Sequence, residues 1–279
     1  MNKFTLELLF RIIGIGSASG LIYKDNTLLL IGDNSAFLYE YDIASTELKR
    51  HPLIDNPSDN IPKKLKPDFE ALAEDENNYY VFGSGSTEKR NSMVQIDKAS
   101  KRIITIMDLT GLYLAMQSFG EISLDDFNIE GVVSAGDRWY FFQRGNGKNG
   151  KNAIFTVQGK NLENDFTILY NSYKLPKIKG VRLSFTDAIA VGNTLYFLAS
   201  AENTESTYLD GDVLGSGIGS INMTTMKMGK TQIITDRYKF EGITLYSATN
   251  DQIEFLLCED NDSDLLESGI YKLVIKNVN

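Results

Sequence analysis

A pattern that recurs five times along the 279 residues constrains this chain more than any other feature. Each copy opens with a polar residue, a small residue and an apolar strand, and a tight turn then leads into a second strand. The clearest copy runs from Glu130-Gly131 through the turn at Gly136-Asp137 to Arg144. Aligned on the polar residue, the copies begin at Ser19, Glu70, Glu130, Asp187 and Glu241. Each copy continues with a third strand and, in most copies, a fourth.

Repeats of about 50 to 60 residues with four short strands each are typical of the blades of a β-propeller. We therefore predict an all-β fold, with residues 1–279 forming a single five-bladed β-propeller of four-stranded blades. The fifth copy has only three strands. The alternating segment Phe4 to Phe10 precedes the first copy, so we expect it to complete the last blade and remove an open sheet edge. A short helix is predicted from Leu109 to Gln117.

Two other architectures are compatible with this many strands. One is a six-bladed propeller, and the other is a pair of stacked β-domains with a boundary near residue 150. The repeat runs through that boundary, which favours one propeller over two domains.

Composition and charge limit the classes of partner. The net charge of −9 and the pI of about 4.8 argue against nucleic acid or an anionic membrane as the main partner. The sequence has no apolar run of about 18 residues, the minimum for a membrane span. Glu7 and Arg11 interrupt the apolar start of the chain, so we do not interpret it as a signal peptide. We expect a cytoplasmic monomer.

The chain has one cysteine and one histidine, Cys258 and His51. This excludes an intrachain disulfide, a multi-cysteine zinc site and a two-histidine metal site, and it disfavours a Ser-His-acid triad. Any chemistry must use carboxylates, Arg, Lys, Tyr, backbone amides or a metal.

Cys258 lies in an apolar run, where a buried hydrophobic role is expected. Trp139 lies in an aromatic run and is expected between blades; a stacking platform for a ligand is the alternative.

The repeated acids form the candidate site. The first strand of a propeller blade lines the central channel, and the acids precede that strand, so we expect Glu70, Glu130, Asp187 and Glu241 to converge at one channel mouth. Arg90 and Arg144 follow the second strands of their blades and are expected to point back at the acids or at an anionic substrate.

Three interpretations of this acidic ring stay open. The acids accept backbone N–H bonds from the next blade and join the blades together. Alternatively, they bind a cation, for which Ca²⁺ is the best candidate because it accepts carboxylate oxygens in flexible geometry. In the third interpretation they line a pocket for a polar small molecule or peptide. Close carboxylates repel one another, so each interpretation requires cations, protons or hydrogen bonds beside them.

A second acidic segment, Glu259 to Asp264, resembles the start of a calcium-binding loop. The glycine that an EF-hand needs at its sixth position is replaced by Leu265, so we interpret Asp260, Asp262 and Asp264 as a solvated hairpin loop. The glycine-rich segments at 83–86 and 215–220 open no helix and are interpreted as turns rather than phosphate-binding loops.

The motifs F-E-A-L, I-E-G-V and F-E-G-I resemble the F-E-G-L element of the esterase-like phytase and SdiA-regulated propeller families. The segments G-S-G-S-T-E-K-R-N and Q-R-G-N look like those of a bacterial family of unknown function, known largely from Bacteroidetes, with a related propeller. The resemblance implies a Ca²⁺-binding or channel-mouth role for Glu70, Glu130 and Glu241. Asp187 matches with a shorter side chain, and Ser19 departs from the pattern.

Two functions from different classes follow. The first is a binding propeller that takes a small molecule, peptide or cation at the acidic mouth. The second is a metal-dependent hydrolase of an ester, lactone or phosphoester. In that enzyme Glu70, Glu130 or Glu241 would act as the base, and Arg90 and Arg144 would stabilise the developing charge. The sequence slightly favours the binding protein, because it contains no paired nucleophile and base.

Overall fold

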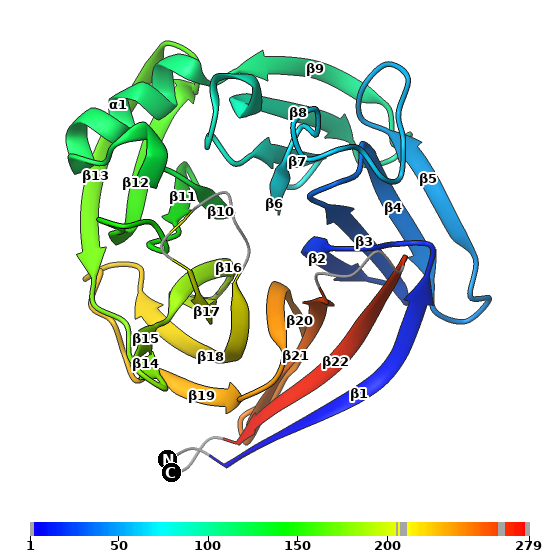
Figure 1. Ribbon diagram of the computed structural model, residues 1–279. Helices are drawn as coiled ribbons and strands as arrows, with labels where there is room; N and C mark the ends of the chain where they lie inside the picture. Colours follow the sequence, from blue (N-terminus) through cyan, green and yellow to red (C-terminus); the bar gives the residue numbers. More distant parts are fainter. Residues whose placement is uncertain (1–2, 205, 207–210, 262–265, 277–279) are drawn as a thin grey trace.

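A computed structural model describes residues 3–204, 206, 211–261 and 266–276 of the protein. Its strands form five four-stranded antiparallel sheets arranged as blades around a central channel (Figure 1). The predicted five-bladed β-propeller is therefore confirmed, and the six-bladed and two-domain alternatives are wrong. No helix in the described ranges is long and apolar enough to cross a membrane.

The blades follow the order of the chain. Blade 1 contains β2 (Ala18–Lys24), β3 (Thr27–Gly32), β4 (Phe37–Asp42) and β5 (Leu48–Pro52). Blade 2 contains β6 (Phe69–Glu74), β7 (Asn78–Gly83), β8 (Ser92–Asp97) and β9 (Ile103–Asp108). Blade 3 contains β10 (Ile129–Ala135), β11 (Arg138–Gln143), β12 (Asn152–Asn161) and β13 (Asp165–Tyr173). Blade 4 contains β16 (Ser184–Val191), β17 (Thr194–Asn203), β18 (Asp212–Asn222) and β19 (Gln232–Thr235). Blade 5 contains β20 (Lys239–Ala248), β21 (Gln252–Asp260), β22 (Glu267–Lys276) and β1 (Phe4–Ile13).

The N-terminal strand closes the ring as predicted. β1 pairs antiparallel with β22, from Phe4 opposite Ile275 to Ile13 opposite Glu267, and the two strands lie side by side in Figure 1. The last blade is thus built from both ends of the chain. This pairing leaves β1 rather than β22 at the outer edge of the blade, and it joins the first residues of the fold to the last.

Short connections interrupt the strands. The helix α1 (Thr110–Gly120) follows blade 2, at the position predicted for the helix, and lies beside β13 on the outside of the ring (Figure 1). Two 3-10 turns, η1 (Glu88–Arg90) and η2 (Leu124–Asp126), and a two-stranded ribbon, β14 (Lys177–Ile178) and β15 (Val181–Arg182), complete the described elements.

The inner hairpins show why these segments form strands. Many of their apolar residues are β-branched or aromatic, which favours extended backbone, and the turns contain residues that tolerate positive φ. In blade 1 the turn residues Asp25 and Asn26 have φ of 48° and 64°, as a two-residue type I′ hairpin requires. Gly136 and Gly192 supply the positive φ in blades 3 and 4.

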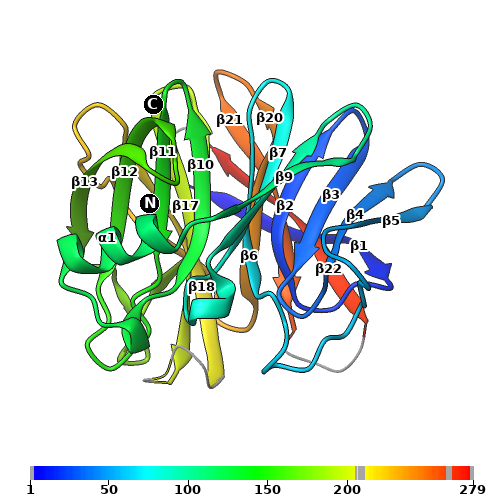
Figure 2. The same cartoon turned by 90° about the horizontal axis from the view of Figure 1, so that it is seen from above.

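Aromatic and aliphatic side chains fill the spaces between adjacent blades. Trp139 of β11 meets Tyr80 of β7 at 4.9 Å and Phe82 at 5.8 Å between ring centroids, both edge to face. Trp139 therefore packs between blades 2 and 3, as expected. Cys258 is fully buried and is a free thiol, which agrees with its predicted hydrophobic role. Seen from the side, the inner strands run between the two faces of the ring (Figure 2).

Candidate functional site

Each inner strand carries an irregularity of register close to its first residue. The pairing shifts in β2, β6, β10, β16 and β20, and each time one residue of the inner strand is left without a partner opposite it. A β-bulge of this kind turns one side chain out of the regular alternation. The bulged residues are Ser19, Glu70, Glu130, Thr186 and Glu241. All five are buried, and they lie at the same end of the channel because they occupy the same position in each blade.

The alignment of the fourth copy on Asp187 is therefore wrong by one residue. The bulge in β16 lies between Phe185 and Asp187, so Thr186 is the equivalent of Glu70 and Glu130. Asp187 occupies the position that is glycine or alanine in the other blades. Its Oδ2 accepts a hydrogen bond from the backbone N–H of Ile243 in blade 5, at 2.8 Å. This is the blade-to-blade bond of the first interpretation, found at Asp187.

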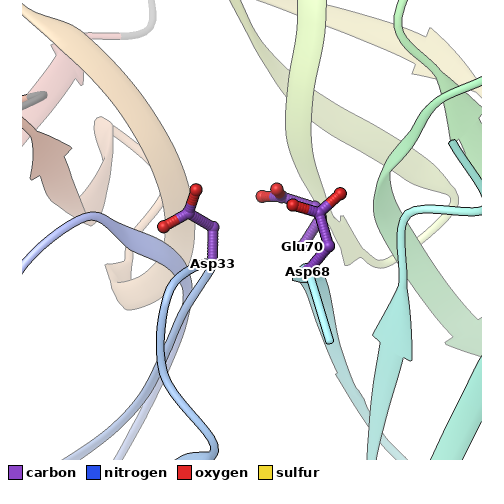
Figure 3. Close-up of side chains that lie close together, drawn as sticks. All are labelled: Asp33, Asp68 and Glu70. Carbon is purple, nitrogen blue, oxygen red and sulfur yellow. The ribbon is translucent and has the colours of Figure 1, made fainter. Parts of the chain in front are cut away.

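Four basic side chains of the protein partly neutralise the acidic end of the channel. In blade 2, the ammonium of Lys66 bonds Asp33 of blade 1 and lies 2.8 Å from Oδ1 of Asp68. Arg90 Nη1 lies 2.8 Å from the other oxygen of Asp68. Ligand oxygens of Asp33, Asp68 and Glu70 all lie within 4.8 Å of one another, and Figure 3 shows the three carboxylates facing each other between the two blades.

Arg144 of blade 3 joins three blades. Its Nη1 lies 2.9 Å from Glu130 Oε1 and 3.7 Å from Glu241 Oε1 of blade 5, and its Nη2 bonds Glu202 of blade 4. Asn128 donates a further hydrogen bond to Glu130, at 2.6 Å. Arg144 therefore does point back to the acids, and Arg90 does so too, although Arg90 bonds Asp68 rather than one of the repeated glutamates.

Lys239 is the fourth cation. Its Nζ lies 3.0 Å from Glu241 and 2.9 Å from Asp260, and all three side chains are at least 94% buried. The interpretation of Asp260 as part of a solvated loop is therefore wrong, because Asp260 ends β21 inside the ring. Asp262 and Asp264 lie outside the described residues.

These groups make one buried arrangement, called here the charged cluster. It comprises Asp33, Lys66, Asp68, Glu70, Arg90, Glu130, Arg144, Glu202, Lys239, Glu241 and Asp260. Blade 4 contributes hydroxyls at the equivalent places: Thr186 donates to the carbonyl of Phe240 at 2.7 Å, and Ser200 lies 2.7 Å from Ser216. With every group ionised, seven carboxylates would face four cations, so acid is in excess.

Burial sets the protonation of the acids. It raises the pKa of Glu70 well above its ordinary value, and the nearby carboxylates of Glu130 and Asp68 raise it further. Burial also raises the pKa of Asp187 well above normal, in opposition to the hydrogen bond from Ile243. For Asp68, burial is outweighed by Lys66 and Arg90, so that its pKa is lowered. A buried acid without a cation beside it holds its proton more tightly than one with a cation.

Several members of the cluster were not among the predicted site residues. Asp68 and Lys239 immediately precede the aromatic residue of the repeat, as Asn128 precedes Ile129, so a polar residue at that position is a usable signal. Lys66 and Glu202 have no counterpart in the other copies, and their contacts appear only in three dimensions. Of the predicted residues, Glu130, Glu241 and Arg144 are brought together directly, whereas Glu70 and Arg90 belong to the part around Lys66.

The cation expected from the sequence must be compared with what already lies among the acids. Asp33, Asp68 and Glu70 offer oxygen ligands at a spacing suited to a divalent ion. The ammonium of Lys66 bonds two of the three, and a divalent cation at the same point would meet a positive charge within about 3 Å. This group as it stands fits an ammonium and does not fit Ca²⁺. Any Ca²⁺ site here requires Lys66 to move away.

The comparisons with known proteins identify the family. The sequence profile of a family of unknown function, DUF6929, matches residues 14–275. The chain belongs to this family. No curated protein matches the sequence.

Solved structures match the fold. A glutaminyl cyclase from Myxococcus xanthus superimposes with a TM-score of 0.55 at 9% sequence identity, over 98% of this chain and 97% of that one. The major allergen Mala s 1 of Malassezia sympodialis gives a TM-score of 0.54 at 10% identity, over 97% and 96% of the two chains. At these identities the similarity concerns the fold alone.

Proposed function

We propose that the charged cluster binds a polar small molecule, or the amino end of a peptide, through a protonated amine. The observation that carries the proposal is the state of Glu70. Only 8% of this residue is exposed, yet within the described residues Glu70 accepts no hydrogen bond and forms no ion pair. A largely buried carboxyl group without a protein partner is costly to ionise, and a ligand ammonium would reduce that cost.

In the part of the chain that the structure describes, several fully buried polar atoms near the cluster lack hydrogen-bond partners, and most of them are acceptors. They are Asp33 Oδ1, Asn128 Oδ1, Asn146 Oδ1 and Asp187 Oδ1, with Arg144 Nε as a donor. Native proteins satisfy nearly all such atoms with protein groups, water or ligands. A set dominated by acceptors calls for a ligand rich in N–H or O–H donors.

The charge balance supports the same class of ligand. The cluster contains more carboxyl groups than cations, so a bound ammonium reduces the imbalance, whereas an anion increases it. The pKa of Glu70 is raised, so Glu70 is expected to lose its proton when an ammonium binds beside it. The affinity should therefore increase as the pH rises, until the amine of the ligand itself loses its proton.

Thermal unfolding with matched ligands tests the proposal. Putrescine, spermidine, amino-acid amides and dipeptides would be titrated against 1,4-butanediol and N-acetylated counterparts, which keep the size but lack the charge. At least one amine should raise the melting temperature, by several degrees at about 100 times its Kd, and the uncharged counterpart should not. The shift should disappear in Glu70→Gln. Equal shifts for amine and diol, or an unchanged response in Glu70→Gln, would contradict the proposal.

A metal-dependent hydrolase is the second candidate: if Lys66 moved away, the carboxylates of Asp33, Asp68 and Glu70 would offer ligand oxygens within 4.8 Å of one another. The resemblance to esterase-like phytase propellers supports the same function. In this enzyme Glu130 or Glu241 would serve as a base, with Arg90 and Arg144 near the developing charge. Its test is turnover of aryl esters, lactones and phosphoesters with Ca²⁺, Mg²⁺ or Mn²⁺, compared between the wild type and Glu130→Gln. Turnover that needs metal and is lost in the variant would favour this function over simple binding.

A further inference from the structure

The end of the channel opposite the charged cluster contains a cavity of about 580 Å³. All five inner strands line it. Its apolar lining includes the residue that follows the small position in every blade: Leu21, Leu72, Val132, Ala188 and Ile243. No member of the charged cluster lines it. We call it the apolar cavity.

Between the two ends of the channel, the inner strands of neighbouring blades pack closely against each other. A Cβ atom on Gly20 would lie 2.9 Å from Leu72 Cβ, and one on Gly131 would lie 3.0 Å from the Cα of Asp187. These contacts explain why the position after the bulge is small: neighbouring inner strands approach each other there. This level lies between the bulged residues and the cavity, and the residues that line the cavity include no member of the charged cluster, so we treat the two as distinct sites.

The cavity offers hydrogen bonds mainly from the backbone. The inner strand is the edge strand of every blade, so alternate N–H and C=O groups of each face the channel rather than a ladder partner. One of them is paired with the neighbouring blade, where Tyr23 N–H of β2 donates to Thr244 Oγ1 of β20 at 3.0 Å. An apolar lining with a few backbone polar groups is typical of small-molecule sites.

Charged residues occur only at the rim of the cavity, and its half-buried ones are paired within the protein. Lys98 Nζ lies 2.5 Å from Glu74 and also donates to the carbonyl of Asp75. Asp75 accepts a hydrogen bond from Tyr80 at 2.6 Å. Lys24 and Glu76 are exposed to solvent. The rim therefore presents no buried charge that a charged ligand would complement.

We propose that the apolar cavity is a second binding site, which takes an uncharged small molecule with an apolar body and one or two hydrogen-bonding groups. A cavity of about 150 Å³ lined by aliphatic residues binds benzene. At about 580 Å³, this cavity accommodates a body on the order of 20 non-hydrogen atoms.

Fluorescence titration with N-phenyl-1-naphthylamine, a neutral aromatic probe, tests this site. Ala190 lines the cavity and is half-buried, so Ala190→Trp adds bulk at the wall of the cavity, and Ala190→Ser is the matched control. We expect saturable binding of one probe per chain, at least tenfold weaker in Ala190→Trp and within twofold of wild type in Ala190→Ser. Circular dichroism establishes that each variant is folded.

A second pair of variants keeps the test decisive if Ala190→Trp does not fold. Ser134 also lines the cavity, so Ser134→Trp should weaken probe binding at least tenfold and Ser134→Ala should not. Glu70→Gln alters the charged cluster alone and should bind the probe as the wild type does. The proposal is overturned if the wild type shows no saturable binding, if folded tryptophan variants bind normally, or if Glu70→Gln weakens binding tenfold.

Discussion

Arg144 and Glu130 are separated by 14 residues in the sequence, and Nη1 of the first lies 2.9 Å from Oε1 of the second. Both side chains are at least 93% buried. The same guanidinium reaches Glu202 of blade 4 and Glu241 of blade 5. One side chain thus supplies positive charge for acids from three blades, and we expect the stability of the ring to depend on it.

Arg144→Met should lower the free energy of unfolding by about 3–5 kcal/mol, because it leaves several buried carboxyl groups without their cation. Arg144→Lys keeps the charge but loses the planar fork that meets Glu130 and Glu202 together, so we expect a smaller loss. Urea unfolding measures both. A loss below about 1 kcal/mol in Arg144→Met would show that the ion pairs contribute little.

Asp187→Ala should destabilise the junction of blades 4 and 5. The substitution leaves the buried N–H of Ile243 without its acceptor, at a cost of about 1–3 kcal/mol. Asp187→Asn keeps an oxygen at this position and removes the ionisable group, so its cost should be smaller. The comparison is made by urea unfolding at pH 7. Equal losses in the two variants would mean that the hydrogen bond to Ile243 is not the important contact.

The fold could be predicted because each blade repeats one local pattern. Alternating apolar residues, residues tolerant of positive φ at the turns and the recurrence of four strands all indicate the same architecture. The N-terminal strand could be assigned to the last blade by the same reasoning. The residues from Phe4 to Phe10 alternate between apolar and polar, and the fifth copy lacks a strand. The repeat did not determine which residue of the fourth copy is equivalent to the glutamates, because Thr186 and Asp187 are both polar. Alignment of Phe185 with Phe69 and Phe240 identifies Thr186 as that residue.

The site could be predicted only in part, for a physical reason. The repeat places acids at one end of the channel, and close acids require compensation, but the compensating groups need not repeat. Arg144 was found because it ends a repeated strand. Lys66 and Glu202 come from segments that differ between blades, so no periodic signal marks them. The apolar cavity leaves no motif either, since its floor is made of ordinary strand residues.

The stability of the protein should respond to pH through Glu70. Its folded-state pKa is raised, so its proton stabilises the fold below the ordinary pKa near 4.5, and this contribution is lost as the pH rises through the folded-state value. Glu70→Gln cannot ionise. It should therefore be at least as stable as the wild type at pH 8, with a smaller advantage near pH 5.

Asp68→Asn is the matched control for this pH dependence. The pKa of Asp68 is lowered in the folded protein, so its carboxylate contributes stability above its ordinary pKa, which is lost as the pH falls. The variant should be clearly less stable than the wild type at pH 8. Melting temperatures of the three proteins between pH 4.5 and 8 give the comparison. Parallel curves for Glu70→Gln and the wild type would contradict the assignment of the shift to Glu70.

Removal of the Lys66 ammonium should convert the neighbouring acids into a cation site. In Lys66→Ala, the ligand oxygens of Asp33, Asp68 and Glu70 remain within reach of one ion, and the charge that excluded a divalent cation is gone. We expect chelator and added Ca²⁺ to change the melting temperature of Lys66→Ala by several degrees and that of the wild type by much less. Lys64→Ala, at an exposed position nearby, controls for the loss of a surface charge. If the wild type responds to Ca²⁺ as strongly as Lys66→Ala, the ion binds while Lys66 is present, and the metal-dependent function gains support over the amine-binding one.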